Sequence, residues 1–174
     1  VLIEQIPVLE SMSPQDFLKF RTQLAPASGF QSVQFRELEF ISGLKDRRYL
    51  NRLVLTEQEL GRLQRRLEEP SLWDSFCALL EWRGLSLPSE DEAARRDSLA
   101  TMARDREYIE EFYLSEDLLT HDELFASWRY RHVMMVERQI GSKTGTGGTT
   151  GASYLRTTLD KRFYPELWEL RGYL

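Results

Sequence analysis

The chain is poor in the side chains that usually bind metals, because its 174 residues include only two histidines and one cysteine. A lone cysteine excludes an internal disulfide and is typical of a reducing compartment. The sequence has no apolar run long enough to cross a bilayer, and it has no signal-peptide pattern. A formal net charge of −5 argues against a nucleic-acid surface. The composition therefore predicts a cytoplasmic enzyme or binding protein.

Convincing alternating strands are also missing, and nearly every segment has helical spacing of its apolar residues. Residues 13–16 (Ser-Pro-Gln-Asp) and 56–59 (Thr-Glu-Gln-Glu) are helix-start patterns. A long charged helix is expected over 89–114. The capping-box pattern Thr-His-Asp-Glu at 120–123 predicts the start of the helix that carries His132. Further helices are expected over 30–44, 72–82 and 154–170. The predicted fold is all-α, a single helical-bundle domain over 1–174 without internal repeats.

His132 stands on the apolar face of its predicted helix. Counting by three and four places a set of mostly apolar side chains on roughly that face: Phe125, Trp128, Met135, Val136 and Gln139. A neutral imidazole in such surroundings suits axial ligation of a haem iron. The alternative is an ordinary core or partner-facing histidine, which spacing alone favours.

Other metal sites need more ligands than this chain offers. A structural zinc site takes four ligands, and a non-haem iron site takes two histidines and a carboxylate. Only His121 is left to join His132, and it lies eleven positions away. Metal chemistry here would depend on a cofactor that supplies most of its own ligands.

The predicted helix runs into a glycine-rich loop at 141–151 (GSKTGTGGTTG). A P-loop is excluded because Lys143 precedes the glycines and a helix leads in, and the dinucleotide fingerprint lacks its strand. The remaining interpretation is a loop that folds over a small polar ligand near His132. A simple helix connector is the alternative, at a high cost in conformational entropy.

A third candidate binding feature lies near the start of the chain, where Phe17, Arg21 and Leu24 lie along one face of a predicted helix. A single arginine among apolar neighbours suits bidentate capture of a carboxylate. The alternative is that Arg21 extends to solvent along its apolar stem.

Three ordered segments carry a family resemblance that runs along the whole chain. They are residues 128–151 (WRYRHVMMVERQIGSKTGTGGTTG), 16–39 (DFLKFRTQLAPASGFQSVQFRELE) and 163–171 (FYPELWELR). Together they closely resemble tryptophan 2,3-dioxygenase, particularly the bacterial form. The resemblance implies an all-α bundle of the tryptophan/indoleamine dioxygenase type that binds haem b (iron protoporphyrin IX). It also implies L-tryptophan and O2 as substrates, N-formyl-L-kynurenine as product, and the first step of tryptophan catabolism.

The resemblance also assigns residues to the cofactor. His132 matches the proximal haem ligand, and Trp128 matches a residue that lines the haem. Ser28 and Gly29 match a Ser-Gly turn near the distal face of the haem. No catalytic side chain beyond the haem is expected in this chain.

The substrate residues follow in the same way. Arg21 matches the arginine that binds the substrate carboxylate, and Phe17 and Leu24 match the aromatic and aliphatic walls beside it. Thr146 matches the threonine that contacts the substrate ammonium group. The family is a homotetramer in which an N-terminal arm completes a neighbour's pocket, so a homotetramer is expected here.

One departure from the family concerns its distal histidine, which lies in a Phe-x-x-x-His segment N-terminal to everything matched here. Neither His121 nor His132 can take that place, and Val1 begins within a helical pattern. The sequence therefore predicts that an N-terminal portion is missing. Two alternatives to the dioxygenase stay open. One is a related haem monooxygenase acting on a tryptophan analogue or another aromatic amino acid, and the other is a non-enzymatic haem-binding homologue.

Overall fold

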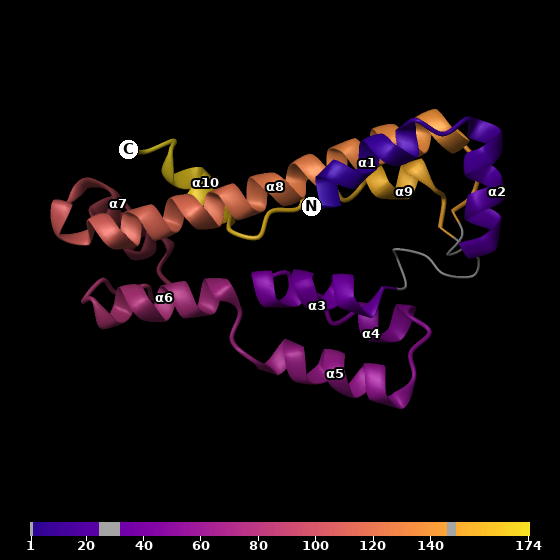
Figure 1. The fold of residues 1–174 in the computed structure, drawn as a ribbon. Coiled ribbons are helices and arrows are strands. Elements are labelled where there is room, and N and C mark those ends of the chain that lie inside the picture. The colour runs from indigo at the N-terminus through magenta and orange to yellow at the C-terminus, as the bar shows by residue number, and fades with distance from the viewer. Residues whose placement is uncertain (1, 25–31, 146–148) are drawn as a thin grey trace.

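The computed structural model describes residues 2–24, 32–145 and 149–174, and within these ranges it is helical with no strand (Figure 1). The prediction of an all-α fold is confirmed. No described helix is both long and apolar enough to cross a membrane. The elements in chain order are α1 (Leu2–Glu10), α2 (Pro14–Leu24), α3 (Val33–Ser42), α4 (Tyr49–Arg52), α5 (Glu57–Glu68), α6 (Leu72–Trp82), α7 (Glu92–Arg104), the 3-10 helix η2 (Arg106–Tyr108), α8 (Ile109–Ile140), α9 (Ala152–Arg156) and α10 (Pro165–Leu170).

The helix α8 organises the molecule. Its 32 residues give it a length of about 48 Å. Figure 1 shows α1, α2 and α9 near its C-terminal end and α7 and α10 near its N-terminal end, with α3 to α6 in a second layer. Side chains on one helix therefore reach both layers and both ends of the fold.

Three apolar clusters hold these helices together. The first joins α6, α7, α8 and α10, and its fully buried members include Leu80, Leu99, Met102, Tyr164 and Leu167. The second joins α1, α2, α8 and α9 through Ile6, Phe17, Met135, Val136, Ile140 and Ala152. The third joins α3, α4 and α5 around Phe40 and Leu63. The second cluster lies next to the candidate site.

Several helix starts follow from local sequence. The backbone N–H of Asp16 donates to Ser13 Oγ at 3.1 Å, as the pattern at 13–16 predicts. Thr56 and Glu59 form the predicted reciprocal capping box of α5. Ser71 and Asp74 form a second box at the start of α6. These caps satisfy backbone N–H groups that have no partner inside their own helices.

The prediction of a helix start at 120–123 is wrong, and so is the single long helix over 89–114. The chain breaks at Asp105, which ends α7 and caps η2, and α8 then continues through 120–123. No glycine or proline lies within α8, so nothing in its sequence ends the helix before the capping-box pattern at 120–123. Asp122 instead is fully buried, and its Oδ2 accepts hydrogen bonds from Phe163 N (3.0 Å) and Trp168 Nε1 (2.9 Å). A tertiary contact therefore uses the residue that resembles a cap.

Candidate functional site

A cavity of about 600 Å³ lies between α2, α3, α8, α9 and the glycine-rich loop. Its size falls in the range of sites for small molecules and cofactors. Apolar side chains make up much of its wall, among them Phe17, Phe35, Trp128 and Val136. The remaining wall includes His132, several charged side chains, and Gly145 and Gly151 of the loop. The cavity is therefore an apolar space with a few polar groups at its edges.

His132 reaches this cavity from the C-terminal half of α8. Burial lowers the pKa of its imidazole below the usual range, so the ring is neutral at pH 7. The Trp128 indole lies one helical turn earlier, 5.2 Å from the imidazole between ring centroids, and contacts the Phe35 ring at 5.1 Å. Within the described part of the chain the imidazole has no hydrogen-bond partner. A neutral imidazole in an apolar frame is suited to bind a metal ion that a cofactor carries.

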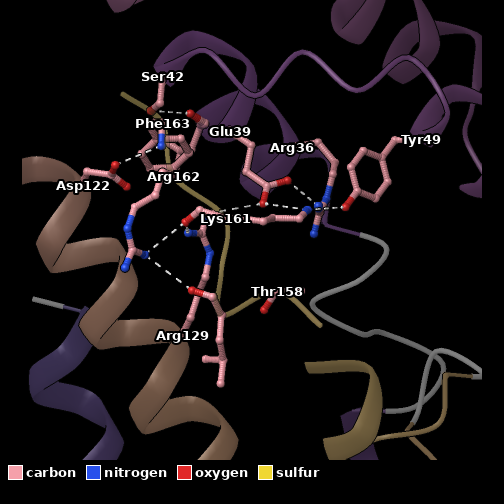
Figure 2. Close-up of polar contacts among 12 residues, drawn as sticks. Arg36, Glu39, Ser42, Tyr49, Asp122, Arg129, Thr158, Lys161, Arg162 and Phe163 are labelled. Atoms are coloured by element: carbon pink, nitrogen blue, oxygen red, sulfur yellow. Dashed lines mark hydrogen bonds and ion pairs between the residues drawn. The ribbon is translucent and has the colours of Figure 1, made fainter. Parts of the chain in front are cut away.

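Charged side chains from α3 and α8 meet at another part of the wall (Figure 2). Glu39 accepts a hydrogen bond from Arg36 Nη1 within α3, and both side chains are almost fully buried. Glu39 Oε1 also lies 3.7 Å from Arg129 Nη2 and 3.8 Å from Lys161 Nζ. The Lys161 ammonium donates to the Tyr49 hydroxyl at 3.0 Å. We call Arg36, Glu39, Arg129 and Lys161 the buried charge cluster.

The buried charge cluster has three cations and one carboxylate, so it carries an excess of positive charge. Burial lowers the pKa of Arg129, although the nearby Glu39 acts in the opposite direction. Arg36 Nε and Arg129 Nη2 are buried and have no hydrogen-bond partner among the described residues. Buried polar groups normally have partners, and charged ones cost the most when they lack them. The cluster is therefore electrostatically suited to bind an anionic group in the cavity.

Tyr154 of α9 adds a hydroxyl group to the wall. Burial is the main cause that raises its pKa to about 12, and a hydrogen bond with Tyr49 acts in the same direction. The Tyr154 phenol is therefore neutral at physiological pH, and it interacts with the same Tyr49 that accepts from Lys161. This side of the cavity holds hydroxyl groups alongside the buried charge cluster.

Arg21 of α2 lines the cavity and contacts the glycine-rich loop. Its Nη2 donates to the carbonyl oxygen of Thr144. The loop is closed on itself by a hydrogen bond from Gly145 N to Thr149 O at 2.9 Å. Gly151 has a φ of +64°, and a Cβ there would lie 2.5 Å from the Lys143 carbonyl oxygen. Glycine is needed at 151 because any side chain would strain the backbone and clash with it.

The structure brings together four of the residues assigned from sequence: Phe17, Arg21, Trp128 and His132 all line one cavity. Ser28, Gly29 and Thr146 lie outside the described residues, as does the side chain of Leu24. Their predicted roles stay predictions. Of the side chains predicted to share the His132 face, Met135 and Val136 also line the cavity.

The other members of that face have different surroundings. Phe125 packs on the first apolar cluster, and Gln139 hydrogen-bonds to α1. His121 Nδ1 lies 3.2 Å from the Tyr164 hydroxyl, and its ring stacks on Phe163 at 5.4 Å. Among the described residues no group of three or more His, Cys, Asp and Glu side chains is arranged to hold a metal ion.

The sequence reasoning did not find the buried charge cluster. Arg36 and Glu39 are three residues apart in a predicted helix, which is the spacing of a helical ion pair. That spacing is common on exposed helix faces, so it does not indicate burial. The contact between Glu39 and Arg129 joins distant parts of the chain and leaves no local signal in the sequence.

Comparisons with known proteins place the sequence among its relatives. The family model described as tryptophan 2,3-dioxygenase matches residues 1–94 and 90–174. A tryptophan 2,3-dioxygenase of Nocardioides sp. is 57% identical over 176 residues, covering 100% of this chain and 65% of the relative. Those of Herpetosiphon aurantiacus and Caulobacter vibrioides are 44% and 42% identical, covering 98% and 94% of this chain and 68% and 67% of the relatives.

The described residues define a helical protein with an apolar cavity whose wall carries a partly buried histidine and an arginine. The family match makes this specific: the chain belongs to the tryptophan 2,3-dioxygenase family. It spans about two thirds of the length of the curated relatives that it matches.

Proposed function

We propose that the protein is a haem-dependent dioxygenase that cleaves the indole C2–C3 bond of L-tryptophan with O2 and gives N-formyl-L-kynurenine. The domain over 1–174 would supply the haem site and the amino-acid clamp. The observation that carries the proposal is one cavity lined by His132, Arg21 and the glycine-rich loop. The names of the relatives support the same substrate.

The residues of the cavity fit a haem. The neutral His132 imidazole would bind the iron, and the Trp128 indole and the Val136 side chain would border the flat macrocycle. A haem b also carries two carboxylates, which need cationic partners in a buried site. Arg36 and Arg129 have buried nitrogens without hydrogen-bond partners in the part of the chain that the structure describes, so they would hold these carboxylates.

The substrate would be held at its α-amino acid end. A carboxylate is a stronger acceptor for the Arg21 guanidinium than the Thr144 carbonyl that it contacts here. Phe17 would pack on the apolar body of the substrate, with Leu24 as a second wall. Thr146, which lies outside the described residues, would contact the substrate ammonium group. Ser28 and Gly29 would lie near the distal side of the haem.

Bound haem iron supplies the activation of dioxygen, and both oxygen atoms enter the product. The chain itself contributes orientation and water exclusion. Arg21 fixes the carboxylate, and the apolar wall keeps the indole away from water. The loop at 141–151 would close over the ligand, because its hydroxyl and N–H groups gain a partner when the ligand binds. We also propose a homotetramer in the cytoplasm, supported by the family and by the single free cysteine.

An absorption spectrum of the purified protein with and without L-tryptophan tests the cofactor and the ligand together. We expect a Soret band that shifts when L-tryptophan is added. Turnover with isotopically labelled O2 then tests the chemistry: two labelled atoms in the product support the dioxygenase, and one supports a monooxygenase. Absence of turnover in a haem-loaded, reduced sample would leave a haem-binding protein without this activity and would refute the proposal.

A further inference from the structure

Gln139 makes an unusual set of contacts for a helix side chain. It lies seven residues after His132 on α8 and is only 4% exposed. Its Nε2 donates to the carbonyl oxygens of Leu9 (3.0 Å) and Met12 (3.2 Å), and Glu10 O lies at 3.5 Å. One amide group thus contacts three backbone carbonyls within residues 9–12, around the end of α1.

Leu9 and Glu10 belong to the last turn of α1, so their carbonyls lie at a helix end. The last carbonyls of a helix have no partner within that helix, and buried ones must find a donor elsewhere. Here the backbone folds back, with Ser11 N donating to Pro7 O and Met12 N to Leu9 O. The Gln139 amide supplies a further donor from α8, so it fixes the end of α1 against the helix that carries His132.

The same contact fixes the start of α2. Met12 directly precedes Ser13, whose hydroxyl accepts from Asp16 N at 3.1 Å and caps α2. Phe17 follows one turn later and is buried in the second apolar cluster beside Val136 and Ile140. The junction between α1 and α2 is therefore attached to α8 at two neighbouring levels, one polar and one apolar.

Arg21 follows Phe17 by one helical turn, so its position depends on this junction. Because α8 carries both His132 and Gln139, a single helix sets the distance between the iron ligand and the residue that binds the substrate carboxylate. We propose that Gln139 is a positioning residue that sets Arg21 relative to His132, and thereby the carboxylate end of the substrate relative to the haem. The substrate part of this inference rests on the proposed function.

The chemistry of the amide explains why this residue type is needed. Three carbonyl acceptors require a donor, and the other end of the amide, Oε1, is buried without a hydrogen-bond partner within residues 2–24, 32–145 and 149–174. A leucine at 139 keeps the volume but removes the donor. Arg138 is the adjacent residue on α8 and is exposed, so R138Q is a matched control on the same helix.

The first test uses two ligands and haem-loaded protein. In Q139L we expect L-tryptophan affinity, read from the haem spectrum, to fall about tenfold, the effect of losing roughly one to two buried hydrogen bonds. Tryptamine, which lacks the carboxylate, should bind as it does to the wild type, and R138Q should change neither affinity. In an R21A background, Q139L should have no further effect on L-tryptophan. Equal losses for both ligands, or additive losses with R21A, would show a general structural role and overturn the proposal.

The second test does not depend on the proposed function. Hydrogen exchange of haem-free protein should show faster exchange in Q139L than in the wild type over residues 5–24, with no change over α5 and α6. Unchanged exchange over 5–24 would overturn the positioning role. If the wild type binds no tryptophan, the proposed function fails while this second test still decides whether Gln139 fixes α1 and α2.

Discussion

Glu39 offers the sharpest test of how the cavity wall is stabilised. It is the carboxylate of the buried charge cluster and lies beside Arg36, Arg129 and Lys161. Its side chain is 2% exposed, and those of Arg36 and Arg129 are 5% and 2% exposed. The change E39Q keeps the shape of the side chain and removes its charge. The two buried guanidinium groups then lose their counter-charge.

Removing one partner of a buried ion pair typically costs about 3–5 kcal/mol. We expect the lower end, about 3 kcal/mol, because the glutamine oxygen still accepts a hydrogen bond and Lys161 stays partly hydrated. The free energy of unfolding of haem-free protein, from urea denaturation followed by circular dichroism, measures this loss. With a slope of roughly 1–3 kcal/mol per molar urea, the midpoint should fall by about 1 M or more.

The matched control is E137Q on α8. Glu137 pairs with Arg156 at 2.6 Å, but these side chains are 30% and 60% exposed. An exposed pair contributes at most about 1 kcal/mol, so E137Q should change stability little. Equal losses in E39Q and E137Q would refute the reasoning that burial makes the charge cluster important.

Four further variants test other parts of the structure. H132A should abolish the Soret band after haem reconstitution, and a normal spectrum would remove His132 as the ligand. R21A should weaken L-tryptophan binding by roughly 2–5 kcal/mol, measured by spectral titration, and unchanged affinity would exclude Arg21 from the site. G151A should lower the thermal midpoint, because its Cβ would lie 2.5 Å from a backbone oxygen at a φ of +64°; a midpoint equal to that of G61A, where space is open, would contradict this. Burial lowers the pKa of His121, so the unfolded state binds more protons below about pH 6.5 and the free energy of unfolding falls as pH drops through that value. H121Q should reduce this pH slope in urea denaturation between pH 7 and 5, and an unchanged slope would show that His121 does not cause it.

Local signals in the sequence predicted the local parts of the fold. Caps at Ser13 and Thr56 depend only on neighbouring residues, and the structure contains both. The box at 120–123 failed because a cap pattern is also compatible with a helix interior. Asp122 accepts a hydrogen bond from the backbone N–H of Phe163, and local spacing does not reveal this distant partner.

The site divides in the same way. His132 and Arg21 were found because each lies on an apolar stripe of one helix and matches a family motif. The buried charge cluster was missed because its members come from α3, α8 and the segment before α10, and only the fold brings them together. Gln139 was placed on the His132 face from spacing, yet its role depends on the end of α1, far away in sequence.

These observations converge on α8 as the rigid element of the site. Along this one helix Asp122 attaches the C-terminal segment, Arg129 joins the buried charge cluster, His132 faces the cavity and Gln139 attaches α1. Helices bend only gently unless a proline, a glycine or an inserted group interrupts them, and α8 contains no proline or glycine. The distances between His132, Arg129 and Gln139, which contacts the junction of α1 and α2, are therefore set by helix geometry. The glycine-rich loop that follows α8 is joined to this frame through Arg21, whose Nη2 donates to the Thr144 carbonyl oxygen.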